Sequence, residues 1–208
     1  MRRITLIAFL GAFVPLIPDT SYAEALVLPQ ARQGYYLGAS AGLWGGRHND
    51  EDIGAISVRD AVITLRLAEA VNHWFGLGMT VDVGSGGNRR FTESMAGLAM
   101  ELQLQPLEHL VVRAGAGMGY VSAKDTTKKL EGMRAAGGAY YTTSLSYELF
   151  PFYTVGSGGL AVTPAIELRH IPGDSFDTTF IGVSVALGYW LGLDKQALEL
   201  PVVEAFAR

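Results

Sequence analysis

Cysteine is absent from the 208-residue chain, and lysine is scarce. Without cysteine, an exported protein has no disulfides, so its stability must come from packing and backbone hydrogen bonds. The only lysines are Lys124, Lys128, Lys129 and Lys195. Charged residues make up 17% of the chain, whereas a soluble domain usually covers its surface with lysine and glutamate. The low charge therefore disfavours an ordinary water-soluble globule.

Basic excess and long apolar runs are also lacking. The formal net charge is −4, which disfavours nucleic acid as a partner. After the N-terminal region, no stretch of 18 consecutive apolar residues occurs, so helical membrane spans are not expected. No motif indicates a metal site or a cofactor, and we expect neither.

The first residues have the pattern of a secretory signal peptide. Arg2 and Arg3 form a basic region, residues 4–17 are apolar, and small residues precede a cleavage point after Ala23. Cleavage after Ala25 is the second choice. The alternative, a membrane anchor, is disfavoured because the apolar run is short for a span and is interrupted by two prolines.

The rest of the chain alternates between apolar and small or polar residues with a period of two. Eight such runs occur, at residues 35–44, 61–68, 75–84, 96–105, 110–120, 139–149, 160–169 and 181–190. Each run has about the 9–11 residues that a tilted strand needs to cross the hydrocarbon of a bilayer. Strands in lipid must close into a barrel, because an open edge would leave backbone groups unpaired.

The polarity of the two faces indicates which one is outside. One face is aliphatic; the other holds mostly glycine, serine, threonine and alanine with isolated charges, which suits a narrow lumen. The lipid-facing set is expected to include Leu65, Leu77, Val81, Leu98, Met100, Val112, Leu145, Ile166, Val183 and Val185. The sequence therefore predicts an all-β fold, a closed antiparallel eight-stranded up-and-down transmembrane β-barrel with a short C-terminal extension. The alternative is a soluble periplasmic lipocalin-like barrel with an apolar interior.

The connections between the runs alternate in length. Residues 45–60, 85–93, 123–134 and 171–178 form polar, mostly long segments, which we predict to be extracellular loops. Residues 69–73 and 106–109 are short, and 150–159 is longer; we predict these to be periplasmic turns. This arrangement places both termini in the periplasm.

The signal peptide, the eight alternating runs and the uneven connections together resemble the small eight-stranded outer-membrane barrels, such as the transmembrane domain of OmpA-like proteins and the OmpX group. The resemblance covers residues 34–193, between a periplasmic segment at 24–33 and a periplasmic tail at 194–208. In one departure, the last strand ends at Tyr189-Trp190-Leu191 with a tail behind it, whereas such chains commonly end on a closing aromatic residue. The resemblance implies a porin-like protein of the Gram-negative outer membrane. Its partners would be outer-membrane lipid, lipopolysaccharide and the barrel-assembly machinery.

Seven charged residues fall in the lumen-facing phase: Arg66, Asp82, Glu101, Arg113, Glu148, Glu167 and Arg169. An eight-stranded barrel is just wide enough for side chains to fill, and buried charges must pair. We therefore expect a static network of arginines and carboxylates that plugs the lumen. The alternative is a gated path for protons or ions.

The expected function is non-enzymatic: envelope integrity, or binding of an unidentified ligand through the loops. The main alternative is a lipid A-modifying enzyme, a deacylase or acyltransferase with serine and histidine near the extracellular rim. The candidate rim residues for such a site are His48, His170 and Ser175. The segment His170-Ile171-Pro172 lacks the nearby serine of the deacylase pattern, so we expect no catalytic residue.

Overall fold

The computed structural model describes residues 34–50, 54–72, 74–107, 109–126, 133–154, 158–173 and 176–191. The expected signal peptide, the segment 24–33 and the tail 194–208 lie outside the described residues. The strands are β1 (Gly34–Asp50), β2 (Gly54–Ala70), β3 (Phe75–Gly87), β4 (Phe91–Leu104), β5 (Leu110–Asp125), β6 (Met133–Tyr147), β7 (Leu149–Thr154), β8 (Gly158–Ile171) and β9 (Phe176–Leu191). In this part of the chain, no helix is long and apolar enough to cross a membrane.

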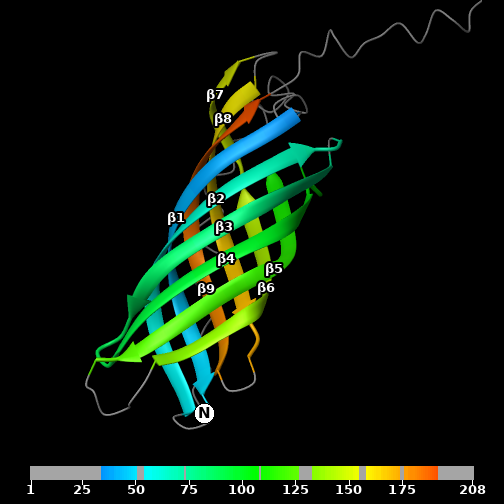
Figure 1. Ribbon diagram of the computed structural model, residues 1–208. Helices are drawn as coiled ribbons and strands as arrows, with labels where there is room; N and C mark the ends of the chain where they lie inside the picture. The colour runs from blue at the N-terminus through cyan, green and yellow to red at the C-terminus, as the bar shows by residue number, and fades with distance from the viewer. Residues whose placement is uncertain are drawn as a thin grey trace, which may run out of the picture.

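Eight of these strands form a closed antiparallel barrel in the order β1-β2-β3-β4-β5-β6-β8-β9 (Figure 1). Each strand pairs with the next, and β9 returns to pair with β1, where Tyr35 lies opposite Leu191. The predicted fold class, an all-β closed barrel of eight strands, is confirmed. We call the end of the barrel where the described chain begins and finishes the entry end.

The expected turn at 150–159 is wrong, because this segment contains the short strand β7. Among the described strands, β7 pairs only with the beginning of β8, from Leu149 opposite Val162 to Thr154 opposite Gly158. It is therefore not a ninth strand of the closed barrel. Pro151 lacks a backbone N–H and is tolerated in a strand that pairs on one side. At the break between β6 and β7, the Glu148 N–H donates to the carbonyl of His109, which carries the β5–β6 register one residue past Tyr147.

The four long loops are also wrong in extent, because strands occupy most of 45–60 and 85–93 and parts of 123–134 and 171–178. The eight barrel strands have 13 to 17 residues each, longer than the alternating runs that predicted them. Only residues 51–53 separate β1 from β2, and only 88–90 separate β3 from β4. At the latter turn, the Asn88 side-chain oxygen accepts hydrogen bonds from the backbone N–H groups of Arg90 and Phe91, which fixes a tight reversal.

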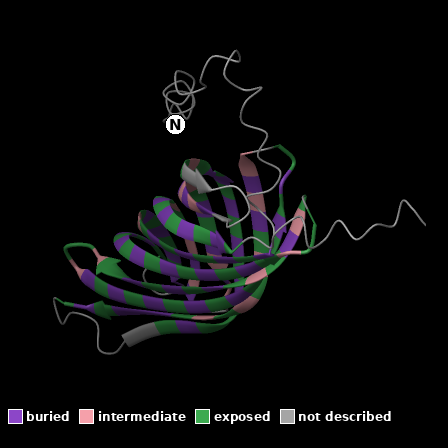
Figure 2. Cartoon of the chain, turned by 90° about the horizontal axis from the view of Figure 1, so that it is seen from above, coloured by how far each residue is buried: buried purple, intermediate pink, exposed green. Residues whose placement is uncertain are grey.

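The outer surface carries the predicted apolar band. Of the ten residues expected to face lipid, nine are between 39% and 64% exposed, and Val112 is partly buried. Figure 2 shows buried and exposed residues alternating along the strands. A water-soluble barrel has the reverse polarity, so the soluble lipocalin-like alternative does not fit this surface.

Toward the end opposite the entry end, the two faces of the strands exchange character: the outward residues become polar, and apolar residues turn inward. In β2, Ile63 and Leu65 face outward, but Ile56 and Val58 face inward while Arg59 faces outward. β4 and β9 change in the same way, with Phe91, Phe176 and Phe180 buried in the lumen. The interior of this part combines these apolar side chains with buried polar ones such as His48 and Glu93, while its exterior is polar. A polar exterior is typical of a barrel in water, so this part lies beyond the apolar band. We call it the projecting end; it comprises residues 44–50, 54–60, 85–87, 91–95, 121–125 and 176–180.

Candidate functional site: the barrel lumen

The lumen contains three layers along the barrel. At the entry end, Tyr36, Ala68, Ala161 and Trp190 form an apolar cluster. A layer of buried arginines and carboxylates follows. A larger apolar cluster, which includes Trp44, then fills the part toward the projecting end.

All seven predicted lumen charges lie in the middle layer and are at most 5% exposed. Nearest the entry end, the Arg113 guanidinium is held by three partners. Its Nε donates to Gln103 Oε1 at 3.0 Å, and its Nη1 donates to Ser146 Oγ at 2.6 Å. Its Nη2 lies 3.2 Å from Glu148 Oε1. Because these partners come from β4, β6 and the break before β7, Arg113 links three segments of the wall.

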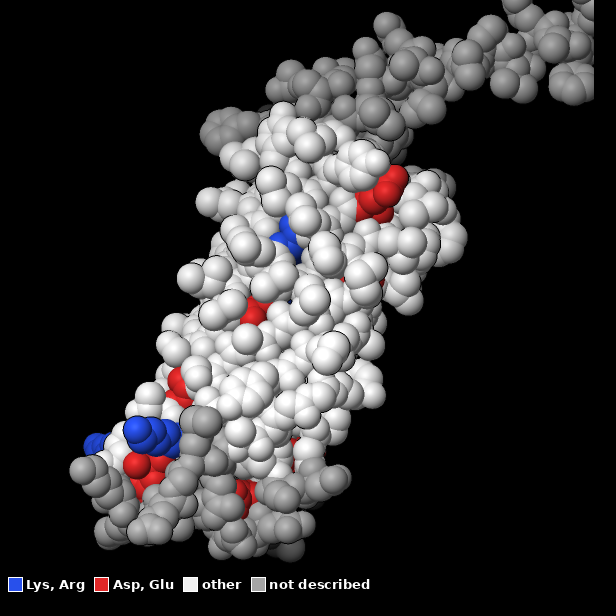
Figure 3. All heavy atoms as spheres, viewed as in Figure 1, with Lys and Arg blue, Asp and Glu red and all other residues white. Residues whose placement is uncertain are grey.

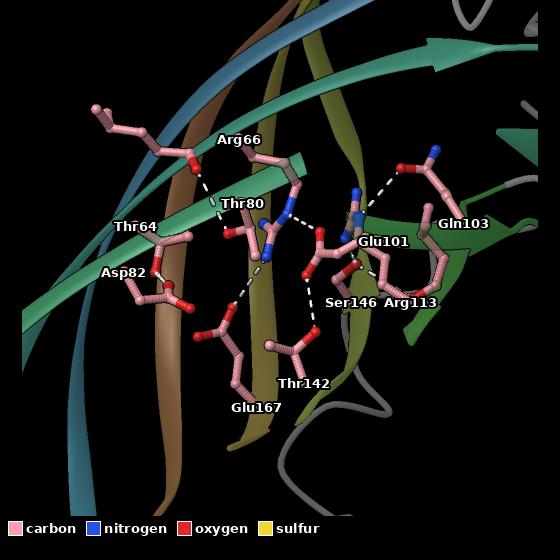
Figure 4. Close-up of polar contacts among 12 residues, drawn as sticks. Thr64, Arg66, Thr80, Asp82, Glu101, Gln103, Arg113, Thr142, Ser146 and Glu167 are labelled. Carbon is pink, nitrogen blue, oxygen red and sulfur yellow. Dashed lines mark hydrogen bonds and ion pairs between the residues drawn. The ribbon is translucent and has the colours of Figure 1, made fainter. Parts of the chain in front are cut away.

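Arg66 and Glu167 connect the middle of the layer (Figure 4). Arg66 Nε donates to Glu101 Oε2 at 2.8 Å, and Arg66 Nη2 lies 3.7 Å from Glu167 Oε1. The other carboxylate oxygen of Glu167 lies 3.4 Å from Arg169 Nη2. Two arginines therefore share one carboxylate across the lumen, between β2 and β8.

Asp82 accepts hydrogen bonds from three side chains on three other strands. Arg169 Nε donates to Oδ2 at 3.1 Å and the Tyr140 hydroxyl donates to the same oxygen at 2.5 Å. The Thr64 hydroxyl donates to Oδ1. A buried carboxylate needs such compensation, because an unpaired buried charge is costly. Asp82 thereby fixes the relative positions of β2, β3, β6 and β8.

Aromatic side chains close the charged layer on both sides. The Arg169 guanidinium lies over the Trp44 ring, 5.0 Å from its centroid, at the boundary with the larger apolar cluster. At the entry end, the rings of Tyr36 and Trp190 pack with centroids 5.1 Å apart. A Cβ at Gly38 or Gly188 would overlap the Tyr36 ring, so these inward glycines make room for it. The arrangement is suited to holding the barrel rigid and to blocking passage along its axis.

The three candidate rim residues lie in different environments. His48 is fully buried inside the projecting end, on β1, whereas the sequence pattern predicts a loop there. His170 lies on the outer face, with Nδ1 3.1 Å from both Thr179 Oγ1 and the Thr178 carbonyl oxygen. Ser175 lies outside the described residues. The structure therefore does not bring the two histidines together.

The partners of His48 do not follow from the local sequence pattern. Its Nδ1 lies 2.8 Å from Thr178 Oγ1, and its Nε2 lies 2.5 Å from Glu93 Oε2. Glu93 is 45 positions from His48 along the chain, and Thr178 is 130 positions away. The one available signal was the alternation of Phe91, Glu93 and Met95 in a single phase, which continues β4 inward past its predicted start.

His48 and Glu93 lie beyond the apolar band, and their burial determines their protonation. Burial lowers the pKa of His48 to about 4, partly offset by the charge of Asp60. Burial raises the pKa of Glu93 to about 8, against a hydrogen bond from Asp60. At neutral pH, the protonated Glu93 therefore donates to Nε2 of a neutral His48, whose Nδ1–H donates to Thr178.

The Thr178 hydroxyl, the His48 imidazole and the Glu93 carboxyl lie in the order of a catalytic triad, in which a histidine held by a carboxyl group activates a hydroxyl nucleophile. Catalysis requires that a substrate reach the hydroxyl. The side chains of His48 and Glu93 have no exposed surface, and Thr178 is likewise fully buried. His48 also stacks on Phe176, with ring centroids 4.8 Å apart, inside the projecting apolar core. The cluster therefore packs the projecting end rather than presenting a reactive group.

A closed barrel of eight antiparallel strands, apolar outside and filled inside, is the architecture of the small outer-membrane barrels. Among solved structures, the chain is similar to Ail, the attachment invasion locus protein of Yersinia pestis, with a TM-score of 0.58 and 11% identity over 75% of this chain and 99% of that one. It is also similar to Neisserial surface protein A, with a TM-score of 0.54 and 13% identity over 74% of this chain and 97% of the other. At these identities the likeness shows the fold alone. No protein-family model matches the chain, and no curated protein matches it.

Proposed function

We propose that this chain is a non-enzymatic protein of the Gram-negative outer membrane with a sealed lumen. It contributes to envelope integrity or presents its projecting end for binding. The observation that carries the proposal is the combination of a continuous apolar exterior with a lumen filled by paired charges between two apolar clusters. An apolar exterior is stable in hydrocarbon, and a filled lumen leaves no wide aqueous path.

We further propose that the entry end faces the periplasm and the projecting end faces the cell exterior. Gly34 and Leu191 belong to the same end of the barrel, so both termini would lie on one side. Outer-membrane barrels extend further on their extracellular side, where their connections are longer. The inverted polarity of the projecting end supports its contact with water on that side.

The sealed lumen predicts that the protein does not conduct ions. Reconstituted in planar bilayers, the chain should give no large, stable single-channel conductance, because Arg66, Arg113 and Arg169 each bridge to a carboxylate outside their own strand. A 16- to 18-stranded porin reconstituted in the same bilayers, with its aqueous channel, gives the positive control. Stable openings of the chain comparable to those of the porin would show that the lumen conducts and would overturn this part of the proposal.

The non-enzymatic assignment predicts an unchanged lipid A. Mass spectra of lipid A from cells that express the chain should match those from cells without it, because the hydroxyl beside His48 is inaccessible. The variants His48→Ala and His170→Ala should give the same spectra. Gain or loss of an acyl chain that either variant abolishes would identify an acyltransferase or deacylase instead.

A further inference from the structure

Acidic side chains are concentrated inside the projecting end, beyond the apolar band. Four carboxyls on β1, β2, β4 and β5 are each at most 6% exposed: Asp50, Asp60, Glu93 and Asp125. The described cations of this end lie mostly on the outside, and Figure 3 shows Lys and Arg side chains gathered at the lower left of the outer face. The interior of this end therefore holds more carboxyls than described cations.

Asp60 and Glu93, the acid pair, lie side by side because the residue between them is a glycine. Gly86 on β3 is opposite Asp60 on β2 and also opposite Glu93 on β4. Residues opposite each other in neighbouring strands point to the same face, so both carboxyls point inward on either side of Gly86. A Cβ at Gly86 would overlap the Asp60 carboxyl, and no side chain separates the two acids.

His48 joins the acid pair to the strands across the lumen. Its Nε2 lies 2.5 Å from Glu93 Oε2, and its Nδ1 lies 2.8 Å from Thr178 Oγ1. The acid pair, His48 and Thr178 are each at most 2% exposed. This chain of contacts therefore ties together the ends of β2, β4, β1 and β9 without contact with water.

The protonation of the acid pair determines whether these contacts are favourable. Burial, and then the charge of Glu93, raises the pKa of Asp60 to about 7. Burial raises the pKa of Glu93 to about 8. Near neutral pH the pair therefore retains a proton. In a mildly alkaline medium both acids are ionised, and two carboxylates face each other in a buried site, which is costly.

The other charged groups that face this interior do not neutralise the acid pair. They are Asp50 on β1, Asp125 on β5 with its partner Arg90, and Arg169 on β8, which lies over the Trp44 ring. Both arginines already pair with a carboxylate outside the acid pair, Arg90 with Asp125 and Arg169 with Asp82. β3 contributes Gly86, and β9 contributes the uncharged Thr178. In the described part of this end, no further cation faces the acid pair.

We propose that protons held by Asp60 and Glu93 keep the projecting end closed, and that their loss in a mildly alkaline medium opens it. This inference goes beyond the function proposed above, because it adds a second, pH-controlled state of the protein. Once both acids are ionised, Glu93 no longer donates to His48 Nε2, and repulsion favours a state in which water enters and hydrates the carboxylates. The paired charges deeper in the lumen keep the rest of the barrel closed.

The direction of the pH effect follows from the three pKa values. The acids stabilise the closed end fully below their ordinary pKa values of 3.8 and 4.5, and this stabilisation is lost as the pH rises through about 7 and about 8. His48, whose pKa is lowered by burial, acts in reverse: its contribution is complete above 6.5 and is lost as the pH falls through about 4. Above about pH 6.5 only the acids change, so the closed end weakens toward alkaline pH.

The test uses an introduced thiol, because the chain has no cysteine. Val58→Cys places the thiol inside the projecting end, where Val58 is 3% exposed, and Ser57→Cys places it on the outer face of the same strand. Each variant is folded in detergent micelles and labelled with iodoacetamide. The labelling rate of Val58→Cys divided by that of Ser57→Cys measures opening, because both rates depend on thiol ionisation in the same way. Ala123→Cys, inside the same end on β5, repeats the measurement if Val58→Cys does not fold.

The ratio of labelling rates should rise roughly tenfold to a hundredfold between about pH 6.5 and about pH 9. Glu93→Gln keeps a hydrogen-bond donor for His48 but cannot ionise, so the rise should shrink. The double variant Glu93→Gln, Asp60→Asn should abolish it. Asp177→Asn, the matched control, removes an outward carboxylate at the same end and should leave the rise unchanged. A ratio that stays constant in the unmodified background, or that rises as much in the double variant, would overturn the inference.

Discussion

Replacement of Asp82 by alanine should destabilise the barrel by about 3–5 kcal/mol, the range expected when one partner of a buried ion pair is removed. The change leaves the Arg169 guanidinium buried without its closest carboxylate and removes the acceptor of the Tyr140 and Thr64 hydroxyls. Urea unfolding in detergent micelles, followed by heat-modifiable gel migration, measures the loss. The midpoint should fall well below that of the unmodified chain.

The matched control for this prediction is the double variant Asp82→Ala, Arg169→Met. It removes both charges, and Glu167 keeps its contact with Arg66. Since a well-packed apolar group often replaces a buried ion pair at little cost, the double variant should recover much of the stability lost in the single one. Equal destabilisation of the two variants would mean that the pairing of Asp82 with Arg169 is not what stabilises this layer.

The second large effect concerns the outer surface. Leu65→Arg places a charge within the apolar band, where arginine costs about 2–4 kcal/mol at the bilayer midplane. Ser57→Arg changes the same face of the same strand at the projecting end, where the cost near the interface is about 0–1 kcal/mol. Both side chains are exposed, so neither substitution meets a packed core. Leu65→Arg should therefore strongly reduce the folded fraction in vesicles, and Ser57→Arg should leave it nearly unchanged.

Gel migration of the folded and heated forms, compared for both variants in the same vesicles, measures this difference. A folded fraction that falls equally in the two variants would show that the polarity inversion along β2 does not mark the edge of the bilayer. A Leu65→Arg chain that folds as well as the unmodified one would contradict the membrane-facing band itself.

The sequence by itself determined the number of barrel strands, the two faces of each alternating run and the seven charged residues that enter the lumen. These follow from the period of two, because side chains on a strand alternate strictly and a shift of one residue would reverse the face. Leu65 and Arg66 were therefore assigned to opposite sides without knowledge of their neighbours. The lumen position of all seven charges follows from the same rule.

The tertiary structure decided where the strands end. The sequence pattern predicts a loop at residues 45–60, because the apolar phase that defines the band stops at Leu43 and Ile63. In the folded chain the alternation continues with inverted polarity: Ile56 and Val58 turn inward to pack the projecting end, while Arg59 meets solvent. If the outward residues are assumed to be apolar along the whole strand, the change from Ile63 to Arg59 on the outer face is mistaken for the end of the strand. The sequence alone does not show that the environment outside the barrel changes from lipid to water at this point.

The tertiary structure also decided the partners. Arg169 meets Asp82 across 87 positions of the chain, and His48 meets Thr178 across 130. No local pattern joins such residues. Their contact depends on the register of every intervening strand pair and on the closure of β9 onto β1, which together set the height and direction of each side chain in the lumen. The period of two fixes the face of each residue, and only the closed barrel fixes its neighbour.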